Sequence, residues 1–388
     1  MPGSRNSSFG SLLVGLGLLL GPLTAGCGGD DFNTVPVTPV GPEIHGLHTV
    51  GGHLEDSTGT TVTLRGVNRS GSEYMCVKGG TVFDGAWGLT AIGAIATWKA
   101  NVVRVPLNEY CWLNAGAAGM NYRKSIQLFV SLLHQYHIVP ILELHWAAPG
   151  TMVADEQQPM PDADHSVDFW TDVATTFASD DGVVFELYNE PFPDSNKDSD
   201  AGWQCWRDGC NATLFMAGKN TGTTYEAVGM AALVSAIRTV APSQLILLGG
   251  LQYSNALTQW MAYAPADGNI APAWHVYSFN SCKSETCWDA APASVAANLP
   301  LFVTELGEDD CAGGFIEPFM QWLDGKGASY LAWSWNSAPS CIAGRGQGSR
   351  PWPLVTDYIS GTPAGGYAQS FHDHLAMVVG NAPATPAP

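Results

Sequence analysis

Basic residues are scarce in this chain. Its 388 residues include 16 Lys and Arg against 35 Asp and Glu, which gives a formal net charge of -19. Nucleic acids and anionic membrane surfaces carry negative charge and would repel such a protein. We therefore expect no nucleic-acid partner, and a neutral substrate suits the charge best.

The signatures of common cofactors are also missing from the sequence. No two cysteines have the Cys-x-x-Cys spacing of zinc or redox sites. No GxGxxG fingerprint of a dinucleotide site follows the first expected strand. No phosphate loop or cluster of transition-metal ligands is evident either. We predict neither a cofactor nor a bound metal.

Residues 1–27 have the pattern of an export signal. Arg5 provides a weakly basic start, and an apolar run at 11–23 is followed by small residues. The ending LTAGC resembles a bacterial lipobox with Cys27 as the lipidated residue, although Thr24 stands where Leu is usual. Two outcomes stay open: anchoring at the cell surface through a lipid on Cys27, or ordinary cleavage and release outside the cell.

The chain is expected to carry flexible segments at both ends. Residues 28–46, GGDDFNTVPVTPVGPEIHG, are predicted to form a tether after the signal. Residues 379–388 are predicted to form a disordered Pro/Ala tail.

An even number of cysteines follows Cys27, which suggests disulfide bonds in an exported protein. The two close pairs can each staple one loop, and the remaining four cysteines pair most simply in chain order, although sequence does not fix the connectivity. The expected pairs are Cys205/Cys210, Cys282/Cys287, Cys76/Cys111 and Cys311/Cys341.

Short apolar runs alternate with helix-like stretches from residue 61 onward. The strand-like runs are 61–68, 101–107, 137–146, 182–190, 244–250, 273–279, 301–307 and 330–336. The helix-like stretches are 89–100, 122–136, 166–179, 224–240, 254–264, 292–299, 316–326 and 367–378. The runs are apolar on both faces, which is typical of parallel strands covered by helices.

Eight such units without a domain-like break predict an α/β fold, a (β/α)8 TIM barrel, as one catalytic domain over residues 47–378. A small hairpin at 48–62 is expected to close the barrel floor. The runner-up fold is an open doubly wound sheet.

In such a barrel the chemistry lies at the carboxyl ends of the strands. There the sequence has mostly polar or aromatic residues: Asn68, Arg104, His145, Asn189, Glu190, His275, Tyr277, Glu305 and Trp335. Two of them, Glu190 and Glu305, are glutamates that follow apolar runs and are expected to face the same mouth. Glycoside hydrolysis needs such a carboxylate pair. A solvated loop acid is the alternative for each glutamate and fits the apolar context less well.

The ordered series resembles the family-5 glycoside hydrolases, the cellulase group among the barrel glycosidases. The motifs that carry the resemblance are LRGVN (64–68), VVRVPL (102–107), LELHW (142–146), LYNEP (187–191) and VTELG (303–307). The resemblance implies a retaining mechanism with Glu190 as acid/base and Glu305 as nucleophile. It further implies that Asn189 binds the sugar 2-hydroxyl, and that Arg104 and Tyr277 hydrogen-bond to the nucleophile. His145 and His275 would hold neighbouring sugar hydroxyls and the acid/base.

Several of these residues have structural alternatives. His145 and His275 could be core histidines, and Arg104 could simply neutralise Glu143. Trp335 is expected to stack under a sugar ring, because sugars present apolar C–H faces to aromatic rings, and Trp333 is expected to lie in the core.

Long mouth loops carry further aromatic residues, Trp146, Trp203 and Trp206. Either they extend a cleft for a polysaccharide or they pack the loops themselves. We expect Trp146 to bind substrate.

The expected activity is that of an endo-β-1,4-glucanase acting as a monomer on β-glucan or a related polysaccharide. Within the same family, β-mannanase, xyloglucanase and exo-β-1,3-glucanase stay open. A different class is a non-catalytic carbohydrate-binding lipoprotein of the cell surface. That class predicts a missing glutamate, and neither glutamate is missing.

A Cys27→Ser substitution tests the lipid anchor. Without the thiol no lipid can be attached, so the protein is expected to move from the membrane fraction to the soluble fraction, as measured by fractionation and intact mass. An unsubstituted protein that is already soluble and begins near Gly28 would contradict the anchor.

Overall fold

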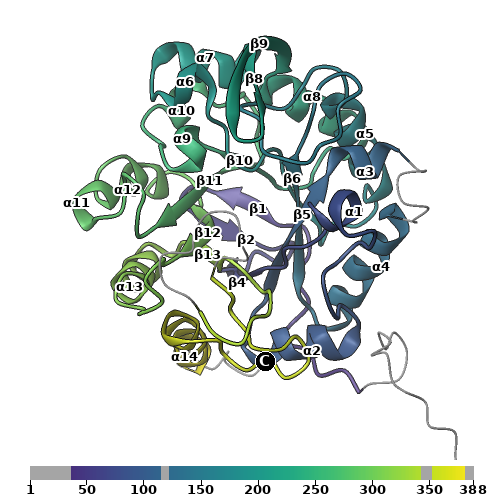
Figure 1. Cartoon of the computed structure of the whole chain (residues 1–388). Coiled ribbons are helices and arrows are strands. Elements are labelled where there is room, and N and C mark those ends of the chain that lie inside the picture. The colour runs from purple at the N-terminus through teal and green to yellow at the C-terminus, as the bar shows by residue number, and fades with distance from the viewer. Residues whose placement is uncertain (1–35, 115–121, 342–351, 381–388) are drawn as a thin grey trace, which may run out of the picture.

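The computed structural model describes residues 36–114, 122–341 and 352–380. Eight strands form a closed barrel in the order β10-β11-β12-β13-β4-β5-β6-β7, with parallel neighbours throughout. Their bounds are β4 Arg65–Asn68, β5 Val102–Asn108, β6 Val139–Trp146, β7 Val184–Glu186, β10 Ile246–Gly249, β11 Ile270–Tyr277, β12 Phe302–Gly307 and β13 Ser329–Ala332. Figure 1 looks along the barrel, with the strands in the middle and helices around them. The predicted TIM barrel is confirmed.

Helices cover the outside of the barrel and connect its strands. The longer ones are α2 Leu89–Thr97, α4 Tyr122–Gln135, α5 Ser166–Thr176, α7 Asp200–Asp208, α8 Met230–Val240, α13 Ile316–Lys326 and α14 Gly366–Gly380. The short ones are α1 Met75–Lys78, α3 Glu109–Leu113, α6 Pro193–Asn196, α9 Leu251–Ser254, α10 Trp260–Tyr263, α11 Glu285–Trp288 and α12 Ala291–Ala296. Among the described residues, none of these helices is long and apolar enough to cross a bilayer.

The inward-facing side chains change from apolar near the floor to charged at mid-height. Val102 and Ile141 are fully buried in the lower apolar layer. Arg104 and Glu143, two residues further along the same strands, are fully buried above them. Side chains alternate between the two faces of a strand, so each of these strands contributes one apolar and one charged group to the interior.

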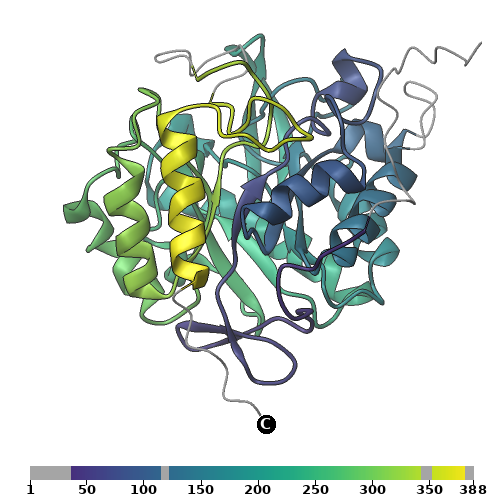
Figure 2. The ribbon, with the colours of Figure 1, turned by 90° about the horizontal axis from the view of Figure 1, so that it is seen from below.

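A small antiparallel sheet closes the lower end of the barrel. It consists of β1 His48–Val50, β2 His53–Glu55 and β3 Thr61–Val62. Leu54 and Val62 belong to the same apolar cluster as the lower layer of the barrel. Figure 2 shows β1 and β2 in purple at one end of the molecule. The expected floor hairpin is present with a third strand, and the run 61–68 is divided between β3 and β4.

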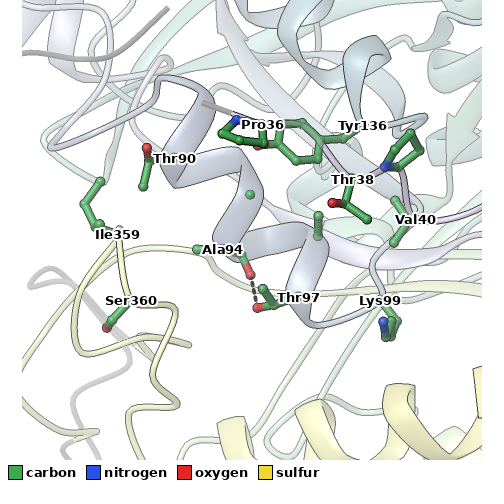
Figure 3. A pocket seen from close by; sticks show the side chains of 13 residues that line it. Pro36, Thr38, Val40, Thr90, Ala94, Thr97, Lys99, Tyr136, Ile359 and Ser360 are labelled. Carbon is green, nitrogen blue, oxygen red and sulfur yellow. Dashed lines mark hydrogen bonds between the residues drawn. The ribbon is translucent and has the colours of Figure 1, made fainter. Parts of the chain in front are cut away.

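Part of the expected tether lies against the barrel. The Val40 amide donates to the Tyr136 carbonyl at 3.0 Å, and the Gly46 amide donates to the Asp181 carbonyl at 2.9 Å. Figure 3 shows Pro36 and Thr38 beside Tyr136 in a cavity bordered by α2. Residues 36–46 are therefore packed rather than free, because their backbone and apolar side chains find partners on the barrel.

The remaining terminal predictions fall largely outside the described residues. These are the signal at 1–27 with Cys27, the first part of the tether, and residues 381–388 of the tail. Residues 379 and 380, which were expected in the tail, belong to α14, since this helix ends at Gly380.

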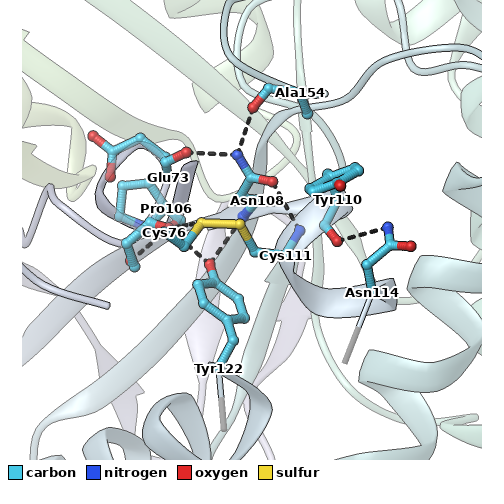
Figure 4. Close-up of a disulfide and its surroundings, with 10 residues drawn as sticks. Glu73, Cys76, Pro106, Asn108, Tyr110, Cys111, Asn114, Tyr122 and Ala154 are labelled. Carbon is cyan, nitrogen blue, oxygen red and sulfur yellow. Dashed lines mark hydrogen bonds between the residues drawn. A yellow bond between two sulfur atoms is a disulfide. The ribbon is translucent and has the colours of Figure 1, made fainter. Parts of the chain in front are cut away.

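All four expected disulfide pairs are formed in the structure: Cys76–Cys111, Cys205–Cys210, Cys282–Cys287 and Cys311–Cys341. Figure 4 shows the first, which joins α1 to α3. Beside it, the Asn108 side chain caps α3 by accepting from the Cys111 amide at 3.0 Å, and it donates to the Glu73 carbonyl at 2.7 Å. Such staples fit an extracellular protein.

The structure contains a β-hairpin that the sequence pattern does not predict. Strands β8 Gly209–Met216 and β9 Lys219–Val228 pair with each other outside the barrel. The sequence predicts a long mouth loop around Trp203 and Trp206 and a helix from residue 224, whereas α8 begins at Met230. The Cys205–Cys210 bond ties the hairpin to α7.

Candidate active site

Glu190 and Glu305 meet at the mouth of the barrel. A carboxylate oxygen of each, together with a ring nitrogen of His275, lies within 4.8 Å of the others. His275 Nδ1 is 3.0 Å from Glu190 Oε1 and 3.5 Å from Glu305 Oε2. The Glu190 side chain is 24% exposed and that of Glu305 only 5%, so Glu190 is the more open to the mouth.

Arg104 lies below this pair and uses all of its donors. Its five N–H groups make hydrogen bonds to four side chains: Glu186, Asn68, Glu305 and Asn189. The shortest are Nε to Glu186 Oε2 at 2.6 Å and Nη1 to Glu305 Oε1 at 2.7 Å. Arg104 Nη2 also lies 3.4 Å from Glu143 Oε2. Arg104 therefore contacts both Glu305 and Glu143, the two partners considered for it. Its closest partner is Glu186, which the sequence does not predict.

The second oxygen of Glu305 is held by Tyr277. The Tyr277 hydroxyl donates a short hydrogen bond to Glu305 Oε2, while Arg104 binds Oε1. The carboxylate thus has two charge-favouring partners, which fix its orientation.

A chain of hydrogen bonds determines which nitrogen of His275 carries a proton. The Thr304 hydroxyl donates to Glu186 Oε1 at 2.9 Å, so its oxygen can accept from His275 Nε2 at 3.1 Å. Neutral imidazole has one N–H, and a proton on Nε2 leaves Nδ1 as an acceptor. A protonated Glu190 can then donate to Nδ1.

The local environment separates the two glutamates in acidity. Burial raises the pKa of Glu190 well above its ordinary value, and the charge of Glu305 raises it further. Burial also raises the pKa of Glu305, but Arg104 and the Tyr277 hydroxyl oppose this shift by favouring the charged form. Burial lowers the pKa of His275 well below its ordinary value, so the ring is neutral. Glu190 is therefore the better proton donor and Glu305 the better anion.

A β-bulge in β12 brings Glu305 into the barrel. The pairing register shifts between Trp274 and His275 on β11, where Val303 and Glu305 become successive partners. Thr304 and Glu305 consequently both bond to groups inside the barrel, although strict alternation would place them on opposite faces.

A cavity of about 400 Å³ opens above the two glutamates. Its lining is His145, Asn189, Glu190, Tyr253, Tyr277, Phe279, Asn280, Glu305, Trp333 and Trp352. His145 Nδ1 is hydrogen-bonded to Glu143 Oε2 at 3.0 Å. The His145 ring also stacks on the Trp333 ring, with centroids 5.5 Å apart. Asn189 presents its Oδ1 to Arg104 and its Nδ2 to Gln157 Oε1 at 3.2 Å.

The expected positions of the two tryptophan side chains after β13 are reversed. Trp335 is fully buried and packs edge-on against Trp98 at 4.9 Å, so it cannot reach a sugar in the cavity. Trp333, which we expected in the core, lines the cavity instead. The expectation failed because β13 ends at Ala332, and strand alternation does not apply beyond it.

The other three predicted tryptophans are not among the residues that line this cavity. Trp146 is half-buried at the end of β6, with Lys78 Nζ 4.5 Å from the centre of its ring, and is not part of the lining. Trp203 and Trp206 are fully buried in α7 and pack on each other, which favours the loop-packing alternative.

Several residues at the site are not among those that the sequence predicts. Glu186 interrupts an apolar strand, and a buried charge in such a run is itself a signal. Tyr253 follows β10, the one expected strand for which no end residue was considered. Phe279, Asn280 and Trp352 lie in loops whose path the sequence does not reveal.

Two groups of side chains within the described residues have the composition of metal ligands: Glu190, His275 and Glu305 form one, and Glu109, Asp162 and His165 the other. In the second group Asp162 accepts hydrogen bonds from the backbone and ring of His165 at the start of α5. Glu109 accepts from Ser166 Oγ at 2.6 Å. These carboxylates are therefore occupied by hydrogen bonds that hold the start of α5 in place.

Comparison with known proteins gives consistent matches. The sequence profile described as cellulase, glycosyl hydrolase family 5, matches residues 56–339. A mannan endo-1,4-β-mannosidase of Streptomyces lividans is 26% identical over 75% of this chain, and the match covers 66% of that protein, slightly less than two thirds. A cellulase of Thermoanaerobacterium sp. is 21% identical over 76% of this chain and 70% of its own length.

A solved structure is similar over nearly the whole barrel. The β-glucanase of Saccharophagus degradans has a TM-score of 0.64 at 20% identity, with 90% of this chain and 98% of that chain covered. This likeness concerns the fold.

A Thr304→Val substitution tests the proton position on His275. The variant removes the acceptor for Nε2–H, so the Nε2–H tautomer is expected to lose its preference. ¹⁵N NMR of histidine-labelled protein, with His275→Gln to assign the signals, measures this directly. Thr304→Ser keeps the hydroxyl and should retain the wild-type spectrum. Identical His275 signals in wild type and Thr304→Val would contradict the assignment.

Proposed function

The chain belongs to glycosyl hydrolase family 5, and we propose that it is a glycosidase, a retaining β-glycanase with Glu190 as acid/base and Glu305 as nucleophile. The observation that carries this proposal is the placement of a Glu190 and a Glu305 carboxylate oxygen within 4.8 Å of each other. Retaining enzymes hold the two carboxyl groups about 5–5.5 Å apart, whereas inverting enzymes need about 6.5–9.5 Å to admit a water.

In the first step, a Glu305 oxygen attacks the anomeric carbon of the bound sugar. The bond from that carbon to the glycosidic oxygen breaks, and Glu190 gives its proton to the departing oxygen. The product is a glycosyl ester of Glu305. The raised pKa of Glu190 supports its role as the donor.

In the second step, water attacks the same carbon while Glu190, now ionised, takes a proton from it. The ester bond breaks and Glu305 returns as a carboxylate between Arg104 and Tyr277. Two inversions give net retention. While Glu190 is protonated, neutral His275 accepts a hydrogen bond from it at Nδ1 and so orients the acid for the first step.

The remaining lining would hold the sugar. Trp333 takes the stacking role that we expected for Trp335, with His145 stacked against it. Asn189 is oriented by Arg104 to meet the 2-hydroxyl. The proposed enzyme is extracellular or held at the cell surface through Cys27, and acts as a monomer without a cofactor.

We favour β-1,4-glucan as substrate, as an endo-acting cellulase would cleave. The cellulase of Thermoanaerobacterium and a solved complex of the S. degradans β-glucanase with cellotetraose support this choice. A second candidate is β-1,4-mannan, because the S. lividans relative is a mannan endo-1,4-β-mannosidase. A non-catalytic carbohydrate-binding role would leave a paired acid and nucleophile without use.

Product profiling on carboxymethyl cellulose, mannan, xyloglucan and laminarin tests the substrate. We expect short oligosaccharides from carboxymethyl cellulose, released at internal bonds, with mannan as the next best substrate. Glu305→Gln, which is nearly the same shape, is the control for contaminating activity. Absence of cleavage on every glycan would support the binding protein over the enzyme.

Stereochemistry and azide rescue test the roles of the two glutamates. Proton NMR of the first product from the wild type should show the β-anomer. Glu190→Ala should lower the rate on polysaccharide at least about a hundredfold, yet still cleave an aryl glycoside with a good leaving group, and azide should give a β-glycosyl azide. Glu305→Ala should lose both activities, and azide should give the inverted product. An α-anomer from the wild type, or full activity of Glu305→Ala, would refute the mechanism.

A further inference from the structure

A second cavity adjoins the site and plays no part in the steps above. It measures about 390 Å³, and we call it the hairpin cavity because one of its walls is strand β8 of the β8–β9 hairpin. The segment 192–196, which follows Glu190 and Pro191, also lines it. Tyr253 lines both the hairpin cavity and the cavity above the glutamates, so the two spaces meet at this residue. In Figure 1 the hairpin lies beside α6 and α9.

The lining of the hairpin cavity combines aromatic rings with small polar groups. Phe192 stacks on Tyr253 at 4.6 Å and meets Phe215 edge-on at 5.3 Å. Along β8, the consecutive residues 210–213 line the cavity together with Phe215, and Asn211 and Thr213 supply its polar groups on this strand. Aromatic faces match the C–H faces of a pyranose, and amide and hydroxyl groups match its hydroxyls.

The charge of this lining also suits a neutral sugar. Within the described residues it includes Asp194 but no lysine or arginine. Lys197 Nζ lies beside this lining but is paired with Asp194 Oδ1 at 3.8 Å, so an anionic ligand would compete with Asp194, whereas a neutral polyhydroxylated ring needs no counter-charge.

Two strained turns hold Tyr253 in its position. Gln252, Tyr253 and Ser254 have φ values of 54, 59 and 57°, and residues 194–196 have φ values of 50, 57 and 63°. Consecutive non-glycine residues rarely adopt this left-handed conformation, and it persists where the surroundings impose it. Here the Tyr253 amide donates to the Pro191 carbonyl at 3.1 Å, and Ser254 Oγ donates to the Asn189 carbonyl at 2.8 Å.

The ring of Tyr253 is available to a ligand. The residue is 37% exposed, and in the described part of the chain its hydroxyl has no hydrogen-bond partner. A strained backbone that presents a half-exposed aromatic ring between two cavities is typical of a ligand contact.

The direction of the glycan follows from the positions of the two glutamates. Glu305 attacks the anomeric carbon, and the groups around it, Tyr277 and Trp333, would enclose the sugar that carries this carbon. Glu190 protonates the oxygen that leaves, and the segment after it forms the wall of the hairpin cavity. The leaving-group half of the chain therefore continues past Tyr253 toward β8.

We propose that the hairpin cavity binds a hexose unit of the same β-glycan on the leaving-group side of the scissile bond, with Tyr253 as the aromatic contact between the two cavities. The proposal rests on the function proposed above. It assigns a specificity-determining role to the hairpin and to the turn that carries Tyr253.

Filling the cavity from β8 tests this assignment. Asn211→Trp places an indole in the hairpin cavity, and Asn298→Trp is the matched control at an exposed position after α12. Each variant and the wild type cleave a hexasaccharide labelled at its reducing end, cellohexaose or mannohexaose, whichever the wild type accepts. An aryl β-disaccharide, whose leaving group is a single phenol, serves as the short substrate.

Asn211→Trp is expected to lower kcat/KM for the hexasaccharide about tenfold more than for the aryl glycoside. Its cleavage pattern should shift toward the labelled reducing end, because fewer sugars fit on the leaving-group side. Tyr253→Ala should give the same shift, and Asn298→Trp should match the wild type on both substrates.

Two results would overturn the proposal: an unchanged ratio and pattern in both Asn211→Trp and Tyr253→Ala, or a shift toward the unlabelled end, which would place the glycosyl half in the hairpin cavity. A wild type that cleaves neither substrate would refute the proposed function instead, so the two failures are distinguishable.

Discussion

One buried guanidinium holds the centre of this barrel together. Arg104 is fully buried and donates its five N–H groups to side chains at the end of β4, at and just after the end of β7, and within β12. Breaking a buried ion pair by removing one partner costs about 3–5 kcal/mol, because the other charge is left uncompensated. The positions of Asn68, Asn189 and Glu305 thus depend on one residue of β5. The hydrogen bonds of Arg104 in the middle of the barrel therefore fix the geometry of the side chains at its mouth.

The same residue sets the protonation of the site. Glu143, Glu186 and Glu305 all lie within 3.4 Å of Arg104, and one positive charge cannot offset three negative charges in a buried place. Burial raises the pKa of Glu143 well above its ordinary value. Glu190, bonded to neutral His275 rather than to Arg104, also retains its proton. Because the interior holds fewer positive than negative groups, the buried Glu190 keeps its proton and can act as the acid.

Much of this arrangement could be predicted from the sequence, because it depends on strands and their ends. Apolar runs at regular spacing indicated the barrel, and the rule that function gathers at strand ends led to Glu190 and Glu305. The rule failed where regular geometry stopped. Trp333 and Trp335 exchanged places because β13 ends at Ala332, and the bulge at Thr304 has no signature in a single sequence. The β8–β9 hairpin was missed because its polar, exposed strand β9 lacks the alternation that reveals a half-buried strand.

The sheet β1–β3 covers the lower end of the barrel, so in the part of the chain that the structure describes only the upper end, with the two glutamates, is open to a ligand. Leu54 and Val62 complete an apolar cluster with Val102, Ile141 and Phe302, and these buried side chains fill the lower end of the barrel within the described residues. A polymer chain can therefore not be threaded through the protein. It has to bind across the mouth of the barrel, and both product fragments have to leave from the same mouth. Binding and release of a long chain therefore depend on the loops of the mouth.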